Sequence, residues 1–273
     1  MRVPFVKMHG LGNDFIVLDA RVHNIPEMAP RTAKVLADRR EGIGCDQVIV
    51  LEALQATDAT ADFRMRIFNS DGGEVESCGN ASRAVALLHA KPARVSTAGG
   101  IIALEPTPLG ATVDMGHPCF EWDAIPLAYA MDTSAMPMGW ATLSAPMAVN
   151  VGNPHVVFFV EDASVIDLEG LGPVIEKDPV FPQEVNVNVA HIVGDDHVVL
   201  RVWERGAGLT RACGTGACAT AVAAILKGLV ESPVRVSLPG GDLEIEWRRG
   251  DPVRMSGPAK EAYRGEFEWD DYA

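Results

Sequence analysis

Short apolar runs separated by turns predict strands through much of the chain. In the first third, residues 15–18 and 48–51 are apolar throughout, and residues 63–67 alternate Phe, Met and Ile with Arg64 and Arg66. Alternation of this kind is typical of a strand with one buried face. These segments therefore predict three strands near the N-terminus.

Two helices are predicted in the same region. The first begins at Pro30, runs to Arg40 and ends at Gly42, because Pro is favoured in the first helical turn and Gly just after the last. The second spans Ala81–Leu88, is rich in Ala and Leu, and ends before Pro92, which cannot continue a helix. We expect this second helix to be buried.

The second half of the chain has a similar pattern. One Ala-rich helix is predicted at residues 216–226 and ends at Gly228. The turn sequence Pro-Gly-Gly-Asp at residues 239–242 predicts a hairpin between the strands that flank it. The strands predicted in this half are residues 156–160, 185–189, 198–202, 234–238 and 243–247.

Two motifs recur at nearly the same spacing and indicate an internal repeat. Gly-Asn precedes a predicted strand at Asn13 and again at Asn153, 140 positions later. Cys-Gly begins a predicted helix at Cys78 and again at Cys213, 135 positions later. The chain is therefore expected to contain two related halves whose equivalent loops face a shared cleft, a common place for a ligand.

A region without clear periodicity lies between the two sets of motifs. Residues 121–145 are rich in Pro, Ala and Met, and we expect them to join the halves. We therefore place an N-terminal half carrying Cys78 at residues 1–120 and a C-terminal half carrying Cys213 at residues 121–273, with the boundary between about 115 and 147. In this division, the C-terminal segment can pack back on the N-terminal half.

Composition narrows the possible partners. The chain has 273 residues, 48% of them hydrophobic, and a net charge of −14 at pH 7. A nucleic-acid or membrane-surface partner requires clustered Lys and Arg, which an acidic chain does not favour. The sequence shows no secretory signal, and no apolar run approaches the roughly 18 residues of a membrane span. These features favour a cytoplasmic protein.

The five cysteines do not form a disulfide or zinc pattern. Their number is odd, no Cys-x-x-Cys occurs, and no His lies near the closest pair, Cys213 and Cys218. We interpret Cys45, Cys119 and Cys218 as small apolar residues of the core, the commonest role of a free cysteine. No metal site is predicted.

Cys78 and Cys213 differ from the others because each follows a Gly-rich turn and precedes a predicted helix. A thiol there lies at the positive end of the helix dipole, so we expect its pKa to be lowered. The free N–H groups of the same helix starts, 79–80 and 214–216, suit a substrate carboxylate. Inversion at an amino-acid Cα needs an acid and a base on opposite faces, and two cysteines from two related halves meet that need.

The sequence gives no sign of a cofactor for such a reaction. No Gly-rich phosphate loop lies beside a lysine suited to a pyridoxal phosphate Schiff base, so catalysis is expected to rest on helix dipoles and on exclusion of water. Residues 10–13 are Gly-rich, but no helix is predicted after them, which argues against a dinucleotide site. His9, His117 and His155 are too widely separated to predict a set of metal ligands.

In these motifs the chain resembles the diaminopimelate epimerases over nearly its full length. A single Cys-Gly-Asn block would be weak support, but the blocks here are many and stand in the family's order. They are KMHGLGNDF (7–15), GCDQ (44–47), FNSDG (68–72), CGN (78–80), GNPH (152–155), ERGAG (204–208), ACGTGA (212–217), PGG (239–241) and SGPA (256–259).

This resemblance implies both a fold and an activity. The fold is α+β, with two pseudo-symmetric halves, each a curved mixed or antiparallel sheet wrapped around a central helix. The activity is that of a PLP-independent isomerase, which interconverts LL- and meso-2,6-diaminopimelate in lysine and peptidoglycan-precursor biosynthesis. The resemblance also implies a homodimer.

By position in the motifs, the resemblance implies roles for individual residues. Cys78 and Cys213 would be the catalytic pair, and His155 and Glu204 would tune the pKa values of the thiols. Glu204 and Arg205 would hold the distal amino-acid end of the substrate, whose zwitterion needs both donors and acceptors. The other implied substrate contacts are Asn13, Gln47, Asn69, Gly79, Asn80, Asn153, Asn186, Gly214 and Thr215.

One block departs from the family pattern. The usual Cys-Gly-Asn-Gly-Ala-Arg reads Cys-Gly-Asn-Ala-Ser-Arg here, with Ala81 and Ser82 at the changed positions. We interpret both as variation at a helix start, where a negative φ accommodates Ala. Ala84 stands where the family often has a second cysteine, which fits a noncatalytic role for that cysteine.

Two other functions remain open from the sequence. A racemase of another amino acid, such as proline, could use the same two cysteines, although the Glu204-Arg205 pair argues for a substrate with a second charged head. A thiol-redox binding protein could instead join Cys78 and Cys213 in a regulatory disulfide. Asn13 and Asn69 could also serve only as turn or cap residues.

Overall fold

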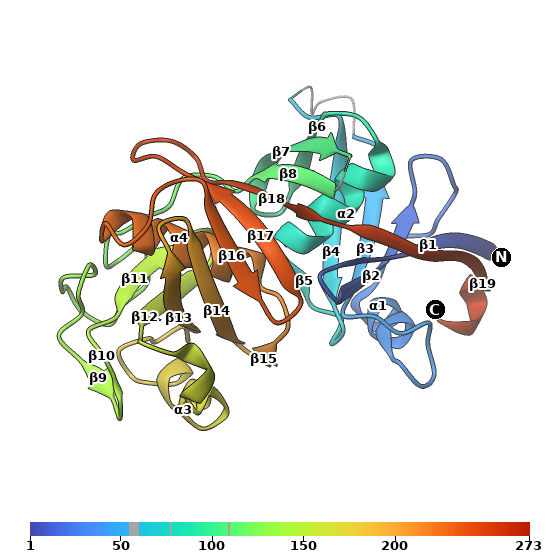
Figure 1. Ribbon diagram of the computed structural model, residues 1–273. Helices are drawn as coiled ribbons and strands as arrows, with labels where there is room; N and C mark the ends of the chain where they lie inside the picture. The colour runs from blue at the N-terminus through green and yellow to red at the C-terminus, as the bar shows by residue number, and fades with distance from the viewer. Residues whose placement is uncertain (55–59, 77, 109) are drawn as a thin grey trace. The chain divides into compact units, whose positions relative to one another are not determined.

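A computed structural model gives the structure of the chain for residues 1–54, 60–76, 78–108 and 110–273. The chain divides into two compact units (Figure 1). Unit 1 comprises Met1–Val113 together with Gly257–Ala273, and unit 2 comprises Asp114–Ser256. Cys78 belongs to unit 1 and Cys213 belongs to unit 2.

Unit 1 is built from strands around the helix α2. Its elements are β1 (Arg2–Gly10), β2 (Asn13–Asp19), α1 (Pro30–Ala37), β3 (Gln47–Glu52), β4 (Phe63–Asn69), β5 (Glu74–Val75), α2 (Gly79–His89), β6 (Ala93–Thr97), β7 (Gly100–Thr107), β8 (Gly110–Asp114), β19 (Lys260–Glu268) and the 3₁₀ turn η2 (Trp269–Asp271). The last strand, β19, returns to pair antiparallel with the first, β1, so the C-terminal segment completes the sheet of unit 1.

Unit 2 is built from strands around the helix α4. Its elements are β9 (Gly139–Trp140), β10 (Leu143–Ser144), β11 (Met147–Asn150), β12 (Pro154–Phe159), η1 (Ala163–Val165), α3 (Leu168–Glu176), β13 (Asn186–Gly194), β14 (His197–Glu204), β15 (Gly208–Thr210), α4 (Gly214–Leu226), β16 (Val234–Leu238), β17 (Gly241–Glu246) and β18 (Arg254–Pro258). The hairpin β9–β10 lies apart from the larger sheet.

The strands of the two units pair in the same succession. In unit 1, β1–β2 is antiparallel, β2–β3 parallel, β3–β4 and β4–β5 antiparallel, and β4–β6 parallel. In unit 2, β11–β12 is antiparallel, β12–β13 parallel, β13–β14 and β14–β15 antiparallel, and β14–β16 parallel. The long helix follows the fifth strand in both cases, so the repeat predicted from two motifs extends through the whole element order.

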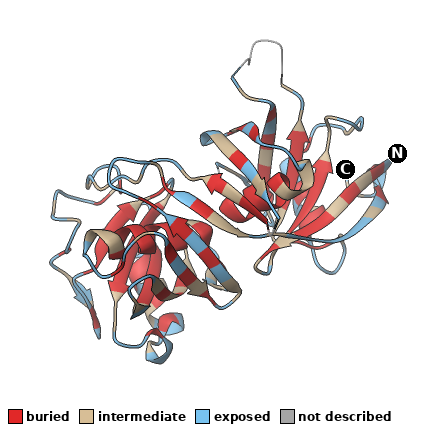
Figure 2. Ribbon diagram, turned by 45° about the horizontal axis from the view of Figure 1, so that its top comes forward, coloured by how far each residue is buried: buried red, intermediate tan, exposed pale blue. Residues whose placement is uncertain are grey.

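The central helices are buried, and most of their side chains are small and apolar. In α4, every residue from Gly216 to Ala224 is buried, and a helix that is apolar on all sides belongs in the core (Figure 2). Residues Gly79 to Ala86 of α2 are buried too, including the charged Arg83. Both helices begin two residues earlier than predicted, because the residues that follow each cysteine already form the first turn.

The segment expected to join the halves instead lies within unit 2. Ile125, Leu127 and Met136 are buried in its hydrophobic core together with residues of β12 and β13. The apolar residues of this segment follow no helical or strand period, so the sequence pattern did not reveal that they are buried.

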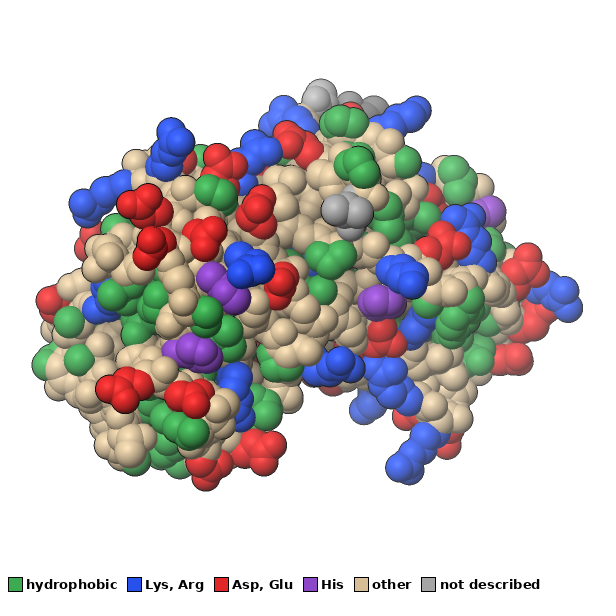
Figure 3. Space-filling model, in the orientation of Figure 1, with side chains coloured by type: hydrophobic (Ala, Val, Ile, Leu, Met, Phe, Trp, Pro, Cys, Tyr) green, Lys and Arg blue, Asp and Glu red, His purple; other side chains and the backbone are tan. Residues whose placement is uncertain are grey.

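The fold belongs to the α+β class, as the resemblance implied, and consists mostly of strands with few helices. Among the described residues, no helix is both long and apolar enough to cross a membrane. On the face shown in Figure 3, acidic and basic side chains are interspersed.

Candidate active site

Each of the two predicted catalytic cysteines caps a central helix. Cys78 precedes α2, and its Sγ accepts a hydrogen bond from the backbone N–H of Ala81 at 3.5 Å. Cys213 precedes α4, and its Sγ accepts from the N–H of Gly216 at 3.3 Å. Both cysteines have extended backbone dihedrals, as N-cap residues do. The topology thus places both sulfur atoms at the N-terminal ends of buried helices.

The helix starts also present backbone donors beside the sulfur atoms. Gly79 and Gly214 are the first helical residues, and Asn80 and Thr215 are the second. The N–H groups of a first helical turn have no carbonyl partner within the helix, so they can bind an anion. The arrangement suits a substrate carboxylate held next to each thiol.

Cys213 lies in an environment that opposes ionisation. Its side chain is only 3% exposed, and the carboxylate of Glu204 lies near it. Burial first and this negative charge second raise the pKa of Cys213 well above its ordinary value, while contacts with Thr215 and with the helix start lower it. The expectation of a lowered pKa is therefore wrong for Cys213, because desolvation outweighs the helix dipole.

Cys78 lies among neutral amide side chains. The Oδ1 atom of Asn13 lies 3.8 Å from Cys78 Sγ and accepts a hydrogen bond from Asn80 Nδ2 at 3.1 Å. Asn13 Nδ2 donates in turn to the carboxylate of Asp46 at 3.0 Å. The structure thus brings together Cys78 and two of the predicted substrate contacts.

Gln47 and Asn69 form a second polar pair in unit 1. They stand opposite each other where β3 begins and β4 ends, and Gln47 Nε2 donates to Asn69 Oδ1 at 2.9 Å. Gln47 Oε1 is buried and has no hydrogen-bond partner among the described residues. A buried acceptor without a partner is costly, so this atom is ready to accept from a ligand N–H.

His155 is fully buried in unit 2 between two amide side chains. Its Nε2 lies 2.9 Å from Asn153 Oδ1, and its Nδ1 lies 3.3 Å from Asn188 Oδ1. Burial lowers the pKa of His155 to about 4, even though the contact with Asn188 favours the protonated ring. The ring is therefore neutral at pH 7.

Asn186 and Arg205 lie together near the start of β13 and the end of β14. Asn186 Oδ1 accepts from the backbone N–H of Arg205 at 2.9 Å, and its Nδ2 donates to the carbonyl of Pro154 at 2.8 Å. Glu204 accepts a hydrogen bond from Thr210 Oγ1 at 2.5 Å. Arg205 Nη1 donates to the carbonyl of Gln183. The two hydrogen bonds of Asn186 connect the loops on either side of it.

Three polar residues of these networks were not predicted from the sequence. They are Asp46, Asn188 and Glu176, whose buried carboxylate accepts from Trp203 Nε1 and from the N–H of Gly206. The first two lie next to predicted residues. Asp46 directly precedes Gln47, and Asn188 is on the same side of its strand as Asn186. Glu176 gave no such signal, since it ends a helix remote in sequence from the motifs.

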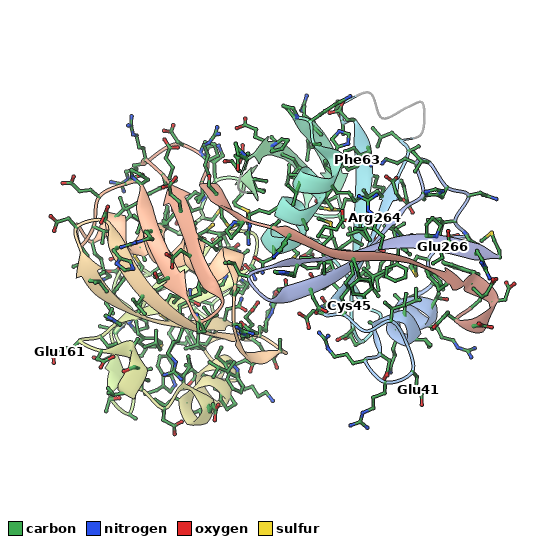
Figure 4. All side chains as sticks on the ribbon, turned by 45° about the vertical axis from the view of Figure 1, so that its right-hand side comes forward. Glu41, Cys45, Phe63, Glu161, Arg264 and Glu266 are labelled. Atoms are coloured by element: carbon green, nitrogen blue, oxygen red, sulfur yellow. The ribbon has the colours of Figure 1, made fainter. Side chains whose placement is uncertain are left out.

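The other three cysteines do not stand at the start of a helix. Cys45 lies near α1 in unit 1 (Figure 4), and burial raises its pKa to about 12. Cys218 is buried within α4, whereas Cys119 is exposed, which contradicts its expected place in the core. Across residues 1–54, 60–76, 78–108 and 110–273, no group of three His, Cys, Asp or Glu side chains is arranged to hold a metal ion.

Comparison with known proteins extends these observations. The family model described as diaminopimelate epimerase matches residues 5–121 and 147–261. A diaminopimelate epimerase of Erythrobacter litoralis is 63% identical over the whole of both chains. One of Pseudomonas syringae pv. tomato is 47% identical over 97% of this chain and 99% of its own.

Solved structures of more distant proteins share the fold. A probable proline racemase from Agrobacterium radiobacter has a TM-score of 0.68 at 15% identity, with 96% of this chain and 92% of that chain covered. A PhzF-family phenazine biosynthesis protein from Bacillus anthracis has a TM-score of 0.66 at 14% identity, with 98% and 99% covered. At such low identity the likeness concerns the fold alone.

Proposed function

The chain belongs to the diaminopimelate epimerase family, and from that premise we propose that it interconverts LL- and meso-2,6-diaminopimelate by inverting one Cα. The observation that carries the proposal is the pair of N-cap cysteines, each at the start of a buried helix in a repeated topology. The product would serve lysine and peptidoglycan-precursor biosynthesis.

The reaction needs one proton removed and one delivered. In one direction, the thiolate of one cysteine takes the α-proton, and the C–H electron pair remains on Cα as a carbanion stabilised by the carboxylate. The thiol of the other cysteine then gives its proton to the opposite face of Cα, which leaves the first sulfur protonated and the second ionised. The reverse reaction exchanges these roles, so no external proton carrier is required within a turnover.

The backbone of the helix starts would stabilise the carbanion. Negative charge spreads from Cα onto the α-carboxylate, and N–H groups at Gly79-Asn80 and Gly214-Thr215 supply preorganised donors. Such donors at a dry site need no reorganisation as the charge develops. This supports a reaction that proceeds without pyridoxal phosphate.

Glu204 would connect substrate binding with the protonation of Cys213. Its negative charge contributes to the raised pKa of Cys213 in the unliganded protein. A substrate ammonium group beside Glu204 would cancel that charge and make the thiolate easier to form. Arg205 and Gln47 Oε1 add a cation and an acceptor, which suit a substrate that carries two amino-acid heads.

Isotope exchange tests the proposed activity. Reduced protein mixed with LL-diaminopimelate in D₂O, without pyridoxal phosphate, is expected to incorporate deuterium at Cα while meso-diaminopimelate forms. Cys78→Ala and Cys213→Ala are each expected to abolish inversion, with circular dichroism as the folding control. Absence of exchange in the wild-type protein would reject the activity, and full turnover in either variant would reject the two-base mechanism.

The same assay separates the other functions. A racemase of proline type would exchange the α-proton of L-proline but not of diaminopimelate, and a redox protein would exchange neither. Titration of free thiols with and without substrate distinguishes a disulfide from a reduced pair.

We also propose that the enzyme works in the cytoplasm as a homodimer. Its five cysteines are free thiols in the structure, a state that a reducing compartment maintains. Light scattering coupled to size-exclusion chromatography measures the oligomeric state, and a mass equal to one chain of 29.2 kDa would reject the dimer.

A further inference from the structure

Four side chains of unit 1 form a continuous line of hydrogen bonds that passes Cys78. Arg83 Nη2 donates to Asn80 Oδ1 at 2.8 Å, and Asn80 Nδ2 donates to Asn13 Oδ1 at 3.1 Å. Asn13 Nδ2 then donates to Asp46 Oδ2 at 3.0 Å. We call this line the amide relay. It connects helix α2 with the first residue of β2 and with the turn that precedes β3.

The two ends of the amide relay determine how its amide groups point. A guanidinium can only donate hydrogen bonds and a carboxylate can only accept them, whereas a carboxamide has one end of each kind. Arg83 therefore requires the oxygen of Asn80, which leaves the nitrogen of Asn80 to face Asn13. Asp46 requires the nitrogen of Asn13, which leaves the oxygen of Asn13 to face Asn80 and Cys78. Both ends favour the same orientation.

The ends of the amide relay are themselves held in place. Arg83 is fully buried, and Asn80 is only 4% exposed, so neither can exchange its partner for water without cost. Asp46 follows Cys45, which Figure 4 labels, and its carboxylate also accepts from the backbone N–H of Asp14 at 3.0 Å. Arg39, more than half exposed, contacts the other oxygen of Asp46 at 2.7 Å.

We propose that Asp46 and Arg83 are positioning residues that act through Asn13 and Asn80 to keep the oxygen of the Asn13 carboxamide turned toward the Cys78 sulfur. The inference rests on the proposed function for its catalytic meaning, since it assigns Asn13 the part of an acceptor for the thiol proton of Cys78. An opposite orientation would present an N–H donor, which favours thiolate. The relay thereby favours the protonated form of Cys78 before substrate binds.

The test replaces the acceptor at one end and measures the reactivity of Cys78 directly. In Asp46→Leu, the Asn13 nitrogen loses its acceptor, so the amide is expected to rotate or withdraw from Cys78. Alkylation of Cys78 by iodoacetamide is measured by mass spectrometry from pH 6 to 10. At pH 7 it is expected to be about threefold faster in Asp46→Leu than in the wild-type protein. The value of kcat/KM for diaminopimelate is expected to fall about tenfold, because Asn13 no longer stands in one orientation.

Two further variants separate orientation from charge and from folding. Asp46→Asn keeps an oxygen that can accept from Asn13, so it is expected to restore the wild-type alkylation profile. Arg39→Ala removes the ion pair on the same carboxylate but leaves the amide relay intact, and is expected to leave the profile unchanged. A purely structural role of Asp46 would lower the thermal midpoint without changing the pH profile of Cys78.

The outcomes decide the proposal whatever the fate of the activity. An unchanged Cys78 profile in folded Asp46→Leu, or a profile of Asp46→Asn as altered as that of Asp46→Leu, would overturn it. If Asp46→Leu does not fold, Arg83→Met removes the donor at the other end and is expected to speed alkylation of Cys78 in the same direction. The proposed function is judged separately, by α-proton exchange in the wild-type protein, because alkylation of Cys78 requires no turnover.

Discussion

The two units have the same succession of strands but different polar interiors around their cysteines. Phe15 in unit 1 and His155 in unit 2 occupy equivalent positions, because each pairs with the first residue of the next parallel strand, Gln47 and Asn186 respectively. Both side chains are fully buried, yet one is an apolar ring and the other an imidazole. Equivalent backbone pairing therefore does not impose equivalent chemistry.

The same difference extends to the groups that surround these two residues. The amide relay of unit 1 ends in Arg83, and the position 135 residues later is Cys218. Conversely, His155 of unit 2 contacts Asn188, which donates to Gly216 and Thr220, whereas the position equivalent to Asn188 is the apolar Ile49. Buried polar groups need partners, so each network depends on several polar residues that occur together in one unit.

The surroundings of the cysteines differ for the same reason. Glu204 ends β14 as Asn69 ends β4, and its charge contributes to the raised pKa of Cys213. Cys78 is partly exposed and adjoins the neutral amide of Asn13, whereas Cys213 is buried near a carboxylate. The same backbone geometry therefore presents the two thiols in different electrostatic surroundings.

The largest effect is expected on the stability of unit 2 at acidic pH, because His155 is buried there. The pKa of this ring is about 4 in the folded chain and near 6.5 when unfolded, so the unfolded state binds more protons between these values. Stability is fully present above pH 6.5 and is lost as pH falls toward 4, by up to roughly 3 kcal/mol. Urea unfolding of unit 2 followed by tryptophan fluorescence between pH 7 and 4.5 measures the loss.

The control for this prediction copies the residue of unit 1. His155→Phe places an apolar ring where the equivalent Phe15 lies, so it is expected to lower stability at pH 7 but to remove most of the loss between pH 6.5 and 4. If His155→Phe loses stability over this range as steeply as the wild type, a different group is responsible.

A smaller effect is expected from exchanging the polar residues that end β4 and β14. Glu204→Gln removes the negative charge beside Cys213, so alkylation of Cys213 at a fixed pH is expected to be faster as its pKa falls. Loss of the proposed charge-assisted contact with a substrate ammonium, worth about 2 kcal/mol, is expected to lower kcat/KM roughly thirtyfold.

The reciprocal change in unit 1 tests whether the carboxylate of Glu204 causes the difference between the two thiols. Asn69→Asp adds the charge at the equivalent end of β4, and is expected to slow alkylation of Cys78. Unaltered alkylation of Cys213 in Glu204→Gln would mean that burial alone protects this thiol.

The smallest effect is expected on stability, from the third residue after each cysteine. This residue is Gly216 in α4 and Ala81 in α2. A Cβ on Gly216 would lie 3.0 Å from Val202 Cγ2 and 3.2 Å from Cys213 Sγ, so Gly216→Ala is expected to cost about 1–2 kcal/mol. Ala81→Gly only adds backbone freedom to a helix and is expected to cost about 0.5–1 kcal/mol. Thermal unfolding compares the two, and an equal or larger loss for Ala81→Gly would contradict the tighter packing of Cys213.

Much of the backbone could be predicted from sequence because local signals are strong. The apolar run at 48–51 lies within β3, and the run at 156–160 overlaps β12. Gly228 follows the end of α4 with a positive φ of 67°. The first helix was predicted to reach Arg40, but it ends at Ala37, since Asp38 already has an extended conformation. Such ends depend on one or two hydrogen bonds and leave little trace in periodicity.

The polar networks could not be predicted in the same way. Asp46 and Arg83 are 37 positions apart in the chain, and no local pattern connects them through Asn13 and Asn80. The sequence named Asn13 and Asn80 as candidates but gave no reason for the orientation of either amide. Likewise it did not indicate that Asn186 would bond two backbone groups of the loops around it.

The sequence by itself determined the repeat, the two central helices and the two cysteines that precede them, because turns and apolar periods act over a few residues. Only the tertiary structure decided how Cys213 ionises. Burial and the charge of Glu204 raise the pKa of Cys213, although the helix dipole alone predicts the opposite. Desolvation is a property of everything packed around a group, and residues far apart in the chain contribute to it.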